Sequence, residues 1–251
     1  MSNSIFRWLG LEKNSSQPAF CAARGNTIKN SLLLQTNIPS RLTAAQIQPV
    51  RFLAHVISIV FHPLLIASYV IGFLLYLHPS LFSGMESKVK AFRFLAVFFS
   101  SFLMPAFAVF LLWRLKFVPS MMLRSAKDRI IPYVMVMVFY FWIWYVYHNL
   151  PENPAPTEHF LLGSFLAICA AWMCNIFFTI SMHSTAMGGL LCFFLLFSFQ
   201  DAYASGLYLS AAFLVAGLVC TARLIVSQHS VGEIYAGLVV GALTQWIAWQ
   251  F

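Results

Sequence analysis

Long apolar stretches fill the second half of this chain, and very few charges interrupt them. Between Phe160 and Phe251 the only formally charged residues are Asp201, Arg223 and Glu233. A hydrocarbon core about 30 Å thick is crossed by about 20 apolar residues in a helix. Inside lipid, every backbone N–H and C=O must be bonded within the span, so such stretches form helices. The sequence therefore predicts an all-α membrane protein.

The composition of the chain excludes a water-soluble globule. Of its 251 residues, 61% are hydrophobic and only 9% are charged, against about 25% charged in an average soluble domain. The mean hydropathy is +0.80. A net charge of +8 does not indicate nucleic-acid binding, because the 15 Lys and Arg lie in loops between apolar spans. The five cysteines show no C-x-x-C spacing and fit a role as small buried side chains.

Seven apolar stretches have a length suited to crossing a membrane, and together they predict a polytopic helix bundle of six to seven spans. They are residues 52–77, 91–113, 131–148, 160–180, 185–200, 206–222 and 233–250. Residues 1–50 are polar and are predicted to be a disordered tail rather than a cleavable signal peptide. The remainder divides into two N-terminal spans over 51–115 and a C-terminal membrane domain over 116–251.

The basic residues predict which side of the membrane each loop faces. With seven spans, the N-terminus, the loop 114–130 and the regions near His183 and His229 fall on one side. That side carries 12 of the 15 Lys and Arg. The positive-inside rule places it in the cytoplasm. We therefore expect an integral protein of a bacterial inner membrane, with its N-terminus and the polar clusters described next on the cytoplasmic side.

One polar cluster joins the last two predicted spans. It runs Arg223-Leu-Ile-Val-Ser-Gln-His229-Ser-Val-Gly-Glu233, and ionisable residues at membrane depth tend to mark functional sites. The four-residue spacing places His229 and Glu233 on one helical face. The carboxylate can then accept a proton from one imidazole nitrogen and leave the other as a base or nucleophile. Arg223 supplies a planar fork that fits a phosphate.

Two further clusters return to the same membrane face, because each lies two spans from the next. In the segment Ser181–Gly189, His183 stands at the start of a span that Ser184 or Thr185 would cap, and the amides of such a helix start attract anions. The basic loop Arg124–Pro132 lies two spans earlier. A single cluster of either kind is commonly a snorkelling histidine or a topology signal. Three clusters on one side favour convergence on one anionic group.

The order and spacing of these clusters resemble the type 2 phosphatidic acid phosphatase family, the membrane branch of the phosphatase and haloperoxidase superfamily. The motifs of that family are approximately K-x6-R-P, P-S-G-H and S-R-x5-H-x3-D. They are similar here to Arg129-Ile-Ile-Pro132, Ile180-Ser181-Met182-His183 and Ala222-Arg223-x5-His229-x3-Glu233. The resemblance covers roughly residues 120–251 and implies that the helix bundle has a core like that of the family.

The resemblance implies a phosphatase or phosphotransferase that acts on a lipid phosphate or diphosphate through a phosphohistidine, without a metal or other cofactor. His229 would attack phosphorus, Glu233 would orient His229, and His183 would protonate the leaving oxygen and then activate water. The side chains that would hold the phosphate are Arg223, Arg129, Lys127, Arg124 and Ser181. The implied partners are a lipid phosphate and the bilayer, with no nucleic acid, and the sequence favours no oligomeric state.

Two departures from the family pattern keep other hypotheses open. Met182 stands where the family has a glycine, and Glu233 stands where it has an aspartate. Both favour a second hypothesis, a non-catalytic lipid-phosphate binder or translocator. A third hypothesis is an unrelated polytopic carrier, in which His183 and His229 need not approach each other.

The first predicted span contains two histidines, His55 and His62, seven residues apart on one helical face and followed by Pro63. A haem or metal pair is one interpretation, and buried polar residues or a helix kink is the favoured one. The aromatic run from Tyr140 to His148 is interpreted as an interfacial belt rather than a pigment or quinone site.

Overall fold

The computed structural model describes residues 44–78, 80–117, 130–200, 205–226 and 229–251. Throughout these ranges the regular elements are helices, and no strand occurs among them. The prediction of an all-α membrane bundle is therefore confirmed. The chain divides into two units, 1–47 and 48–251, and the bundle described below belongs to the second. Of the predicted tail over 1–50, residues 1–43 lie outside the described residues, and residues 44–50 belong to a helix. The cluster Arg124, Lys127 and Arg129 also lies outside the described residues.

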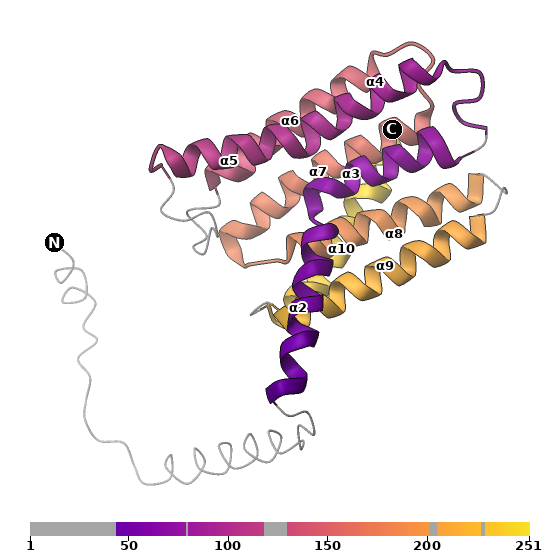
Figure 1. The fold of residues 1–251 in the computed structure, drawn as a ribbon. Helices are drawn as coiled ribbons and strands as arrows, with labels where there is room; N and C mark the ends of the chain where they lie inside the picture. The colour runs from indigo at the N-terminus through magenta and orange to yellow at the C-terminus, as the bar shows by residue number, and fades with distance from the viewer. Residues whose placement is uncertain (1–43, 79, 118–129, 201–204, 227–228) are drawn as a thin grey trace, which may run out of the picture. The chain divides into compact units, whose positions relative to one another are not determined.

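The described segments are helices that follow one another along the chain (Figure 1). Their bounds are α2 Ala44–Val60, α3 Pro63–Gly72, η2 Phe73–Leu77, α4 Ser87–Phe98, η3 Phe99–Leu103, α5 Met104–Arg114, α6 Ile130–His148, α7 Ala155–Phe177, α8 Met182–Gln200, α9 Ser205–Val226 and α10 Val231–Ala248. The π-helical segment η2 extends α3, and η3 joins α4 to α5 in one span. Within the described residues six spans are long and apolar enough to cross a membrane, and there are seven if the bent pair of α2 and α3 counts as one span.

The first predicted span, residues 52–77, consists of two helices that meet at a bend. Helix α2 ends at Val60, α3 begins at Pro63, and the two helices are bent by 60°. Proline lacks an N–H and drives the residue before it into an extended conformation. His62 accordingly has φ −64° and ψ 138° and serves as the N-cap of α3. Because His55 lies on α2 and His62 at the bend, they do not share one helical face, and the favoured interpretation of a kink is confirmed.

Helix α8 lies inside the bundle and packs against α3, α7, α9 and α10 (Figure 1). Glycines allow its close approach to α10. A Cβ at Gly241 would collide with the Thr185 carbonyl oxygen, and a Cβ at Gly237 would collide with the Ser184 hydroxyl. Small residues four apart allow helix backbones to approach closely in membranes. The first turns of α8 and α10 therefore lie side by side, and the candidate site is built there.

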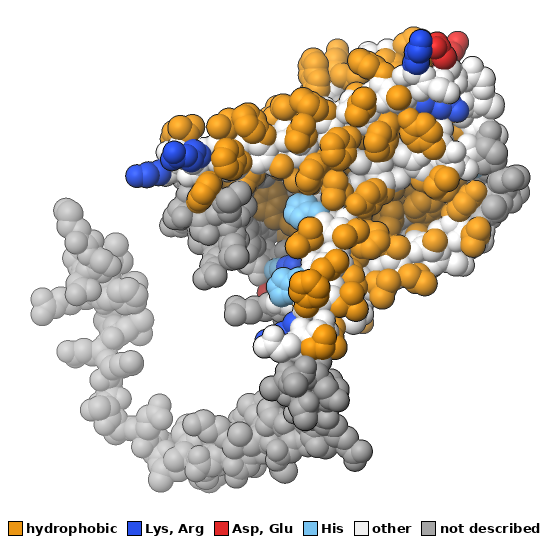
Figure 2. Space-filling model, viewed as in Figure 1, with side chains coloured by type: hydrophobic (Ala, Val, Ile, Leu, Met, Phe, Trp, Pro, Cys, Tyr) orange, Lys and Arg blue, Asp and Glu red, His pale blue; other side chains and the backbone are white. Residues whose placement is uncertain are grey.

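Hydrophobic side chains cover the face of the helices shown in Figure 2, whereas charged side chains gather near helix ends. Large apolar residues are exposed on the spans, for example Phe107 on α5, Phe141 on α6 and Phe213 on α9. A soluble monomer does not expose so continuous an apolar surface. Lipid is the solvent that suits this surface, so the protein is an integral membrane protein.

Candidate functional site

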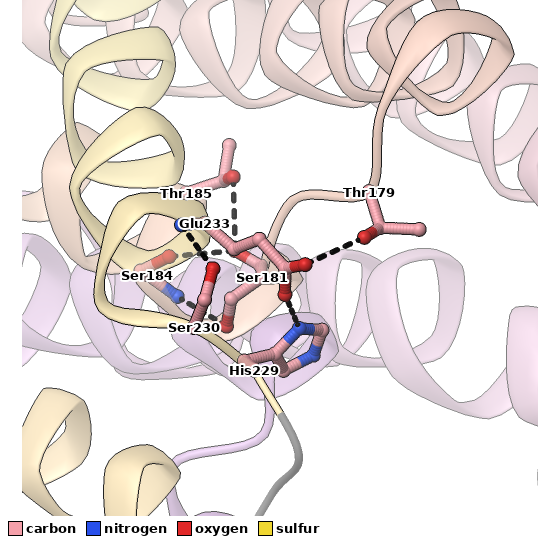
Figure 3. A network of polar contacts seen from close by, with 7 residues as sticks. All are labelled: Thr179, Ser181, Ser184, Thr185, His229, Ser230 and Glu233. Atoms are coloured by element: carbon pink, nitrogen blue, oxygen red, sulfur yellow. Dashed lines mark hydrogen bonds and ion pairs between the residues drawn. The ribbon is translucent and has the colours of Figure 1, made fainter. Parts of the chain in front are cut away.

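The start of α8 is capped by Ser181. Its Oγ accepts a hydrogen bond from the N–H of Ser184 (3.5 Å), and its carbonyl accepts from the hydroxyls of Ser184 (2.8 Å) and Thr185 (3.1 Å; Figure 3). The prediction that Ser184 or Thr185 caps this helix is wrong. Both lie in its first turn, where a hydroxyl bonds back to a carbonyl three or four residues earlier. Ser181 is fully buried, and its hydroxyl serves the helix start.

The start of α10 is capped by Ser230, whose side chain accepts from the N–H of Glu233 (3.3 Å). The carbonyl of Glu233 in turn accepts from the N–H of Ser181 (3.4 Å). This backbone bond ties the segment before α8 to the first turn of α10. It fixes the position from which the Glu233 side chain extends.

Glu233 orients His229. The Nδ1 atom of His229 lies 2.6 Å from Oε2 of Glu233, and Oε1 of Glu233 accepts from the Thr179 hydroxyl at 2.9 Å (Figure 3). A carboxylate accepts from Nδ1–H, so the lone pair of the neutral ring lies on Nε2. The side chains of His229 and Glu233 are 19% and 28% exposed, so a ligand can reach them. This arrangement presents an oriented imidazole with a nucleophilic nitrogen.

His183 is held by the helix that precedes the bend. Its Nε2 donates to the Ser58 carbonyl on α2 at 3.0 Å. Its ring packs edge-to-face against His62, with centroids 5.6 Å apart and planes at 81°. His183 also interacts electrostatically with Arg223 and His229. His62, His183 and Arg223 therefore lie near the oriented ring of His229, and the charges of these groups influence one another.

These groups line a single cavity of about 620 Å³. His62, His183, Arg223 and His229 are among its lining residues, and most of the rest of the lining is apolar. The cavity also reaches Gln245 on α10. From the first residue of α10 to Gln245 the helix rises about 21 Å at 1.5 Å per residue. The cavity thus has polar groups near the helix starts and continues deep between the helices.

The structure brings together much of the site predicted from sequence. His183, Arg223 and His229 line the cavity, while Glu233 bonds to His229 and Ser181 caps α8. Arg124, Lys127 and Arg129 lie outside the described residues. Pro132, which ends the same cluster, is described and lines the cavity.

The sequence does not indicate two groups at the site, the Ser58 carbonyl and Thr179, and it singles out His62 without connecting it to this site. The pair His62-Pro63 carries a local signal, because a polar residue before proline is a common helix start. Nothing local indicates that the bend faces α8, which comes much later in the chain. The Thr179 contact likewise depends on how the segment before α8 folds against α10.

Among the residues that the structure describes, no group of three His, Cys, Asp or Glu side chains is placed to hold a metal ion. Comparison of the chain with protein-family models, curated proteins and solved structures gives no match.

Proposed function

We propose that this protein is an integral-membrane phosphatase or phosphotransferase for a lipid phosphate or lipid diphosphate. The observation that carries the proposal is the single cavity lined by His183, Arg223 and His229, with Glu233 bonded to His229. Phosphoryl transfer through a covalent intermediate needs an oriented nucleophile, a proton donor and a cation for the phosphoryl oxygens. The order of these residues resembles that in the type 2 phosphatidic acid phosphatase family, which supports the same chemistry.

The walls of the cavity support a lipid as the substrate. Ligand cavities are commonly about 300–1,000 Å³ and mostly apolar, with a few polar groups that fix orientation. Here the charged and imidazole side chains lie near the starts of α8 and α10. Most of the remaining lining is apolar, for example Val136, Phe160 and Ile168, with a few polar residues such as Ser164 and Gln245. A phosphate at the polar end would leave an attached hydrocarbon chain against the apolar walls.

In the first chemical step, Nε2 of His229 attacks phosphorus and the bond from phosphorus to the leaving oxygen breaks, which gives a phosphohistidine. Glu233 stabilises the positive charge that the ring acquires. Arg223 holds the phosphoryl oxygens and stabilises the charge that develops on them.

His183 supplies the proton for the leaving oxygen. In the protonated ring, Nε2–H stays on the Ser58 carbonyl and Nδ1–H is the proton to be transferred. The negative charge of the bound phosphate stabilises this imidazolium. In the second step the neutral His183 takes a proton from water as the water oxygen attacks phosphorus, releasing inorganic phosphate and His229. With an alcohol in place of water, the same steps give phosphotransfer.

A second candidate function is a lipid-phosphate binder or translocator without turnover. The observation that favours it is Met182, whose side chain lines the cavity where the family has a glycine. A bulky side chain at this position leaves less space for a phosphate to reach His229.

We place the protein in a bacterial inner membrane with the site on the cytoplasmic side, because most Lys and Arg of the chain fall on that side by parity. Helix α10 runs from the site to its end at Ala248, so the C-terminus at Phe251 faces the opposite side. A reporter enzyme that is active only in the periplasm is expected to be active when it is fused after Phe251. Activity of a reporter that works only in the cytoplasm would show that the orientation is the opposite one.

Phosphate release by the purified, detergent-solubilised protein tests the proposed function. The substrates are phosphatidic acid, phosphatidylglycerophosphate, a polyprenyl diphosphate and a phosphorylated glycolipid. We expect release by the parent protein and none by His229→Ala. The matched control is His55→Ala, because His55 is exposed on α2 and bonds only to the Arg51 carbonyl within the described residues.

The same panel separates the two candidate functions. Binding of these lipids without phosphate release, lost in Arg223→Ala, would contradict the phosphatase and support the binder. Neither release nor binding would contradict both.

A further inference from the structure

His62 is a third histidine of the cavity, and the reaction proposed above gives it no role. It lies at the bend between α2 and α3 and lines the same cavity as His183, Arg223 and His229. Its ring is in edge-to-face contact with that of His183. The N-terminal helices therefore contribute a side chain to a site whose other polar groups come from the last three helices.

The hydrogen bond that His62 makes defines which nitrogen it offers to a ligand. Its Nδ1 accepts from the N–H of Leu64 at 3.4 Å, as the cap of α3. A neutral imidazole that accepts at Nδ1 carries its proton on Nε2. No residue in the described part of the chain bonds to Nε2 of His62. The ring thus retains one N–H donor at the cavity.

An N–H donor inside an apolar bundle is costly unless a ligand or water accepts from it. Next to this donor are the ring of His183 and, interacting with that ring, the Arg223 guanidinium. Imidazole and guanidinium donors that lie together can bind an anion with several oxygen acceptors. Hydrogen bonds to charged oxygens are stronger than those between neutral groups. A phosphate has enough oxygens to accept from His62, from Arg223 and, when His183 is protonated, from its Nδ1–H.

We propose that His62 is a headgroup-binding residue that donates Nε2–H to a phosphoryl oxygen of the lipid held by Arg223. The inference rests on the proposed function for the nature of the ligand, but it does not depend on turnover. It adds the α2–α3 bend to the site, so the headgroup is enclosed by helices from both ends of the sequence.

The variant His62→Asn separates this role from a purely structural one. Asparagine is a good helix cap and Pro63 keeps the bend, but its short amide does not replace the imidazole N–H. His55→Asn is the matched control, since it makes the same change on the exposed face of α2.

The experiment is a calorimetric titration of the detergent-solubilised full chain with dodecyl phosphate and, separately, with dodecanol. We expect His62→Asn to bind dodecyl phosphate about tenfold more weakly than the parent, the loss of one hydrogen bond to a charged oxygen. Dodecanol binding and the melting temperature should be unchanged, and His55→Asn should match the parent throughout.

Equal affinity of the parent and His62→Asn for dodecyl phosphate would overturn the inference, and so would a parent that does not bind it. The inference would also be overturned if His62→Asn had a lower melting temperature and lost affinity equally for dodecyl phosphate and dodecanol. In that case His62 would act by maintaining the bend and not by donating its N–H to the phosphate. If the parent binds dodecyl phosphate but releases no phosphate from any lipid, the proposed phosphatase fails and the role of His62 stands.

Discussion

Glu233 connects two parts of the site through one side chain. Its two oxygens reach His229 on one side and Thr179 on the other, at 2.6 and 2.9 Å. The four-residue spacing predicted the contact of His229 with Glu233, but the prediction that both lie on one helical face is wrong. His229 precedes Ser230, the extended N-cap of α10, and its ring contacts Glu233 from outside the helix. The Thr179 contact could not be predicted, because it depends on the segment before α8 folding back beside α10.

Replacement of Glu233 tests how the carboxylate orients His229. Glu233→Gln should lower kcat by about 10²–10⁴, because the amide no longer stabilises the positive ring. Glu233→Asp should also lower kcat, since the shorter side chain does not reach both partners from the same backbone position. Steady-state kinetics on the best substrate measures both effects. A Glu233→Asp enzyme as fast as the parent would show that the longer carboxylate is not fitted to this site.

The proposed mechanism needs an unprotonated nucleophilic imidazole and a protonated His183 at the same time, which predicts a bell-shaped dependence of kcat on pH. The profile belongs to kcat, because the bound phosphate is what stabilises the imidazolium of His183. The measurement is kcat between about pH 5 and 9. A flat profile over this range would contradict the division of roles.

At the scale of the elements, glycines bring α8 and α10 into contact. Gly241, in the third turn of α10, lies against the carbonyl of Thr185 in the first turn of α8. The number of spans could be predicted from apolar length alone. The bend at Pro63 was foreseen as a kink, but its position against α8 depends on packing between segments far apart in sequence.

Gly241→Ala should destabilise the bundle by about 1–3 kcal/mol, because the added methyl group collides with backbone rather than with a movable side chain. The control is Gly217→Ala on α9, where a Cβ meets nothing within 4 Å. That change should be neutral or stabilising, since alanine is the better helix former. Thermal unfolding in detergent compares the two variants, and equal stability would count against the close α8–α10 contact.

At the scale of the whole molecule, the bundle encloses a cavity that is polar near the starts of α8 and α10 and mostly apolar elsewhere. The sequence predicted the membrane bundle and the convergence of polar clusters by parity. It did not predict the cavity, because cavities arise from the three-dimensional packing of several helices. The apolar part of the cavity is the feature of the fold that supports the proposed lipid substrate.

Filling the apolar part of the cavity should change which chain lengths are accepted. Ala167 on α7 lines the cavity, so Ala167→Phe should reduce kcat/KM for long-chain phosphates more than for short-chain ones. Ala211→Phe is the control, because Ala211 is exposed on α9. Alkyl phosphates of increasing length measure the preference. The same chain-length profile in both variants would mean that the chain does not occupy this cavity.

In the proposed mechanism, His229 forms a covalent bond to the phosphoryl group of a lipid. The most direct test is to quench the enzyme during turnover of a lipid labelled in its phosphoryl group and to look for label on the protein. We expect label that is stable to alkali and released by acid, as for a phosphohistidine, located at His229 and absent from His229→Ala. Phosphate release by the parent without any labelled protein, or label retained in His229→Ala, would contradict the mechanism.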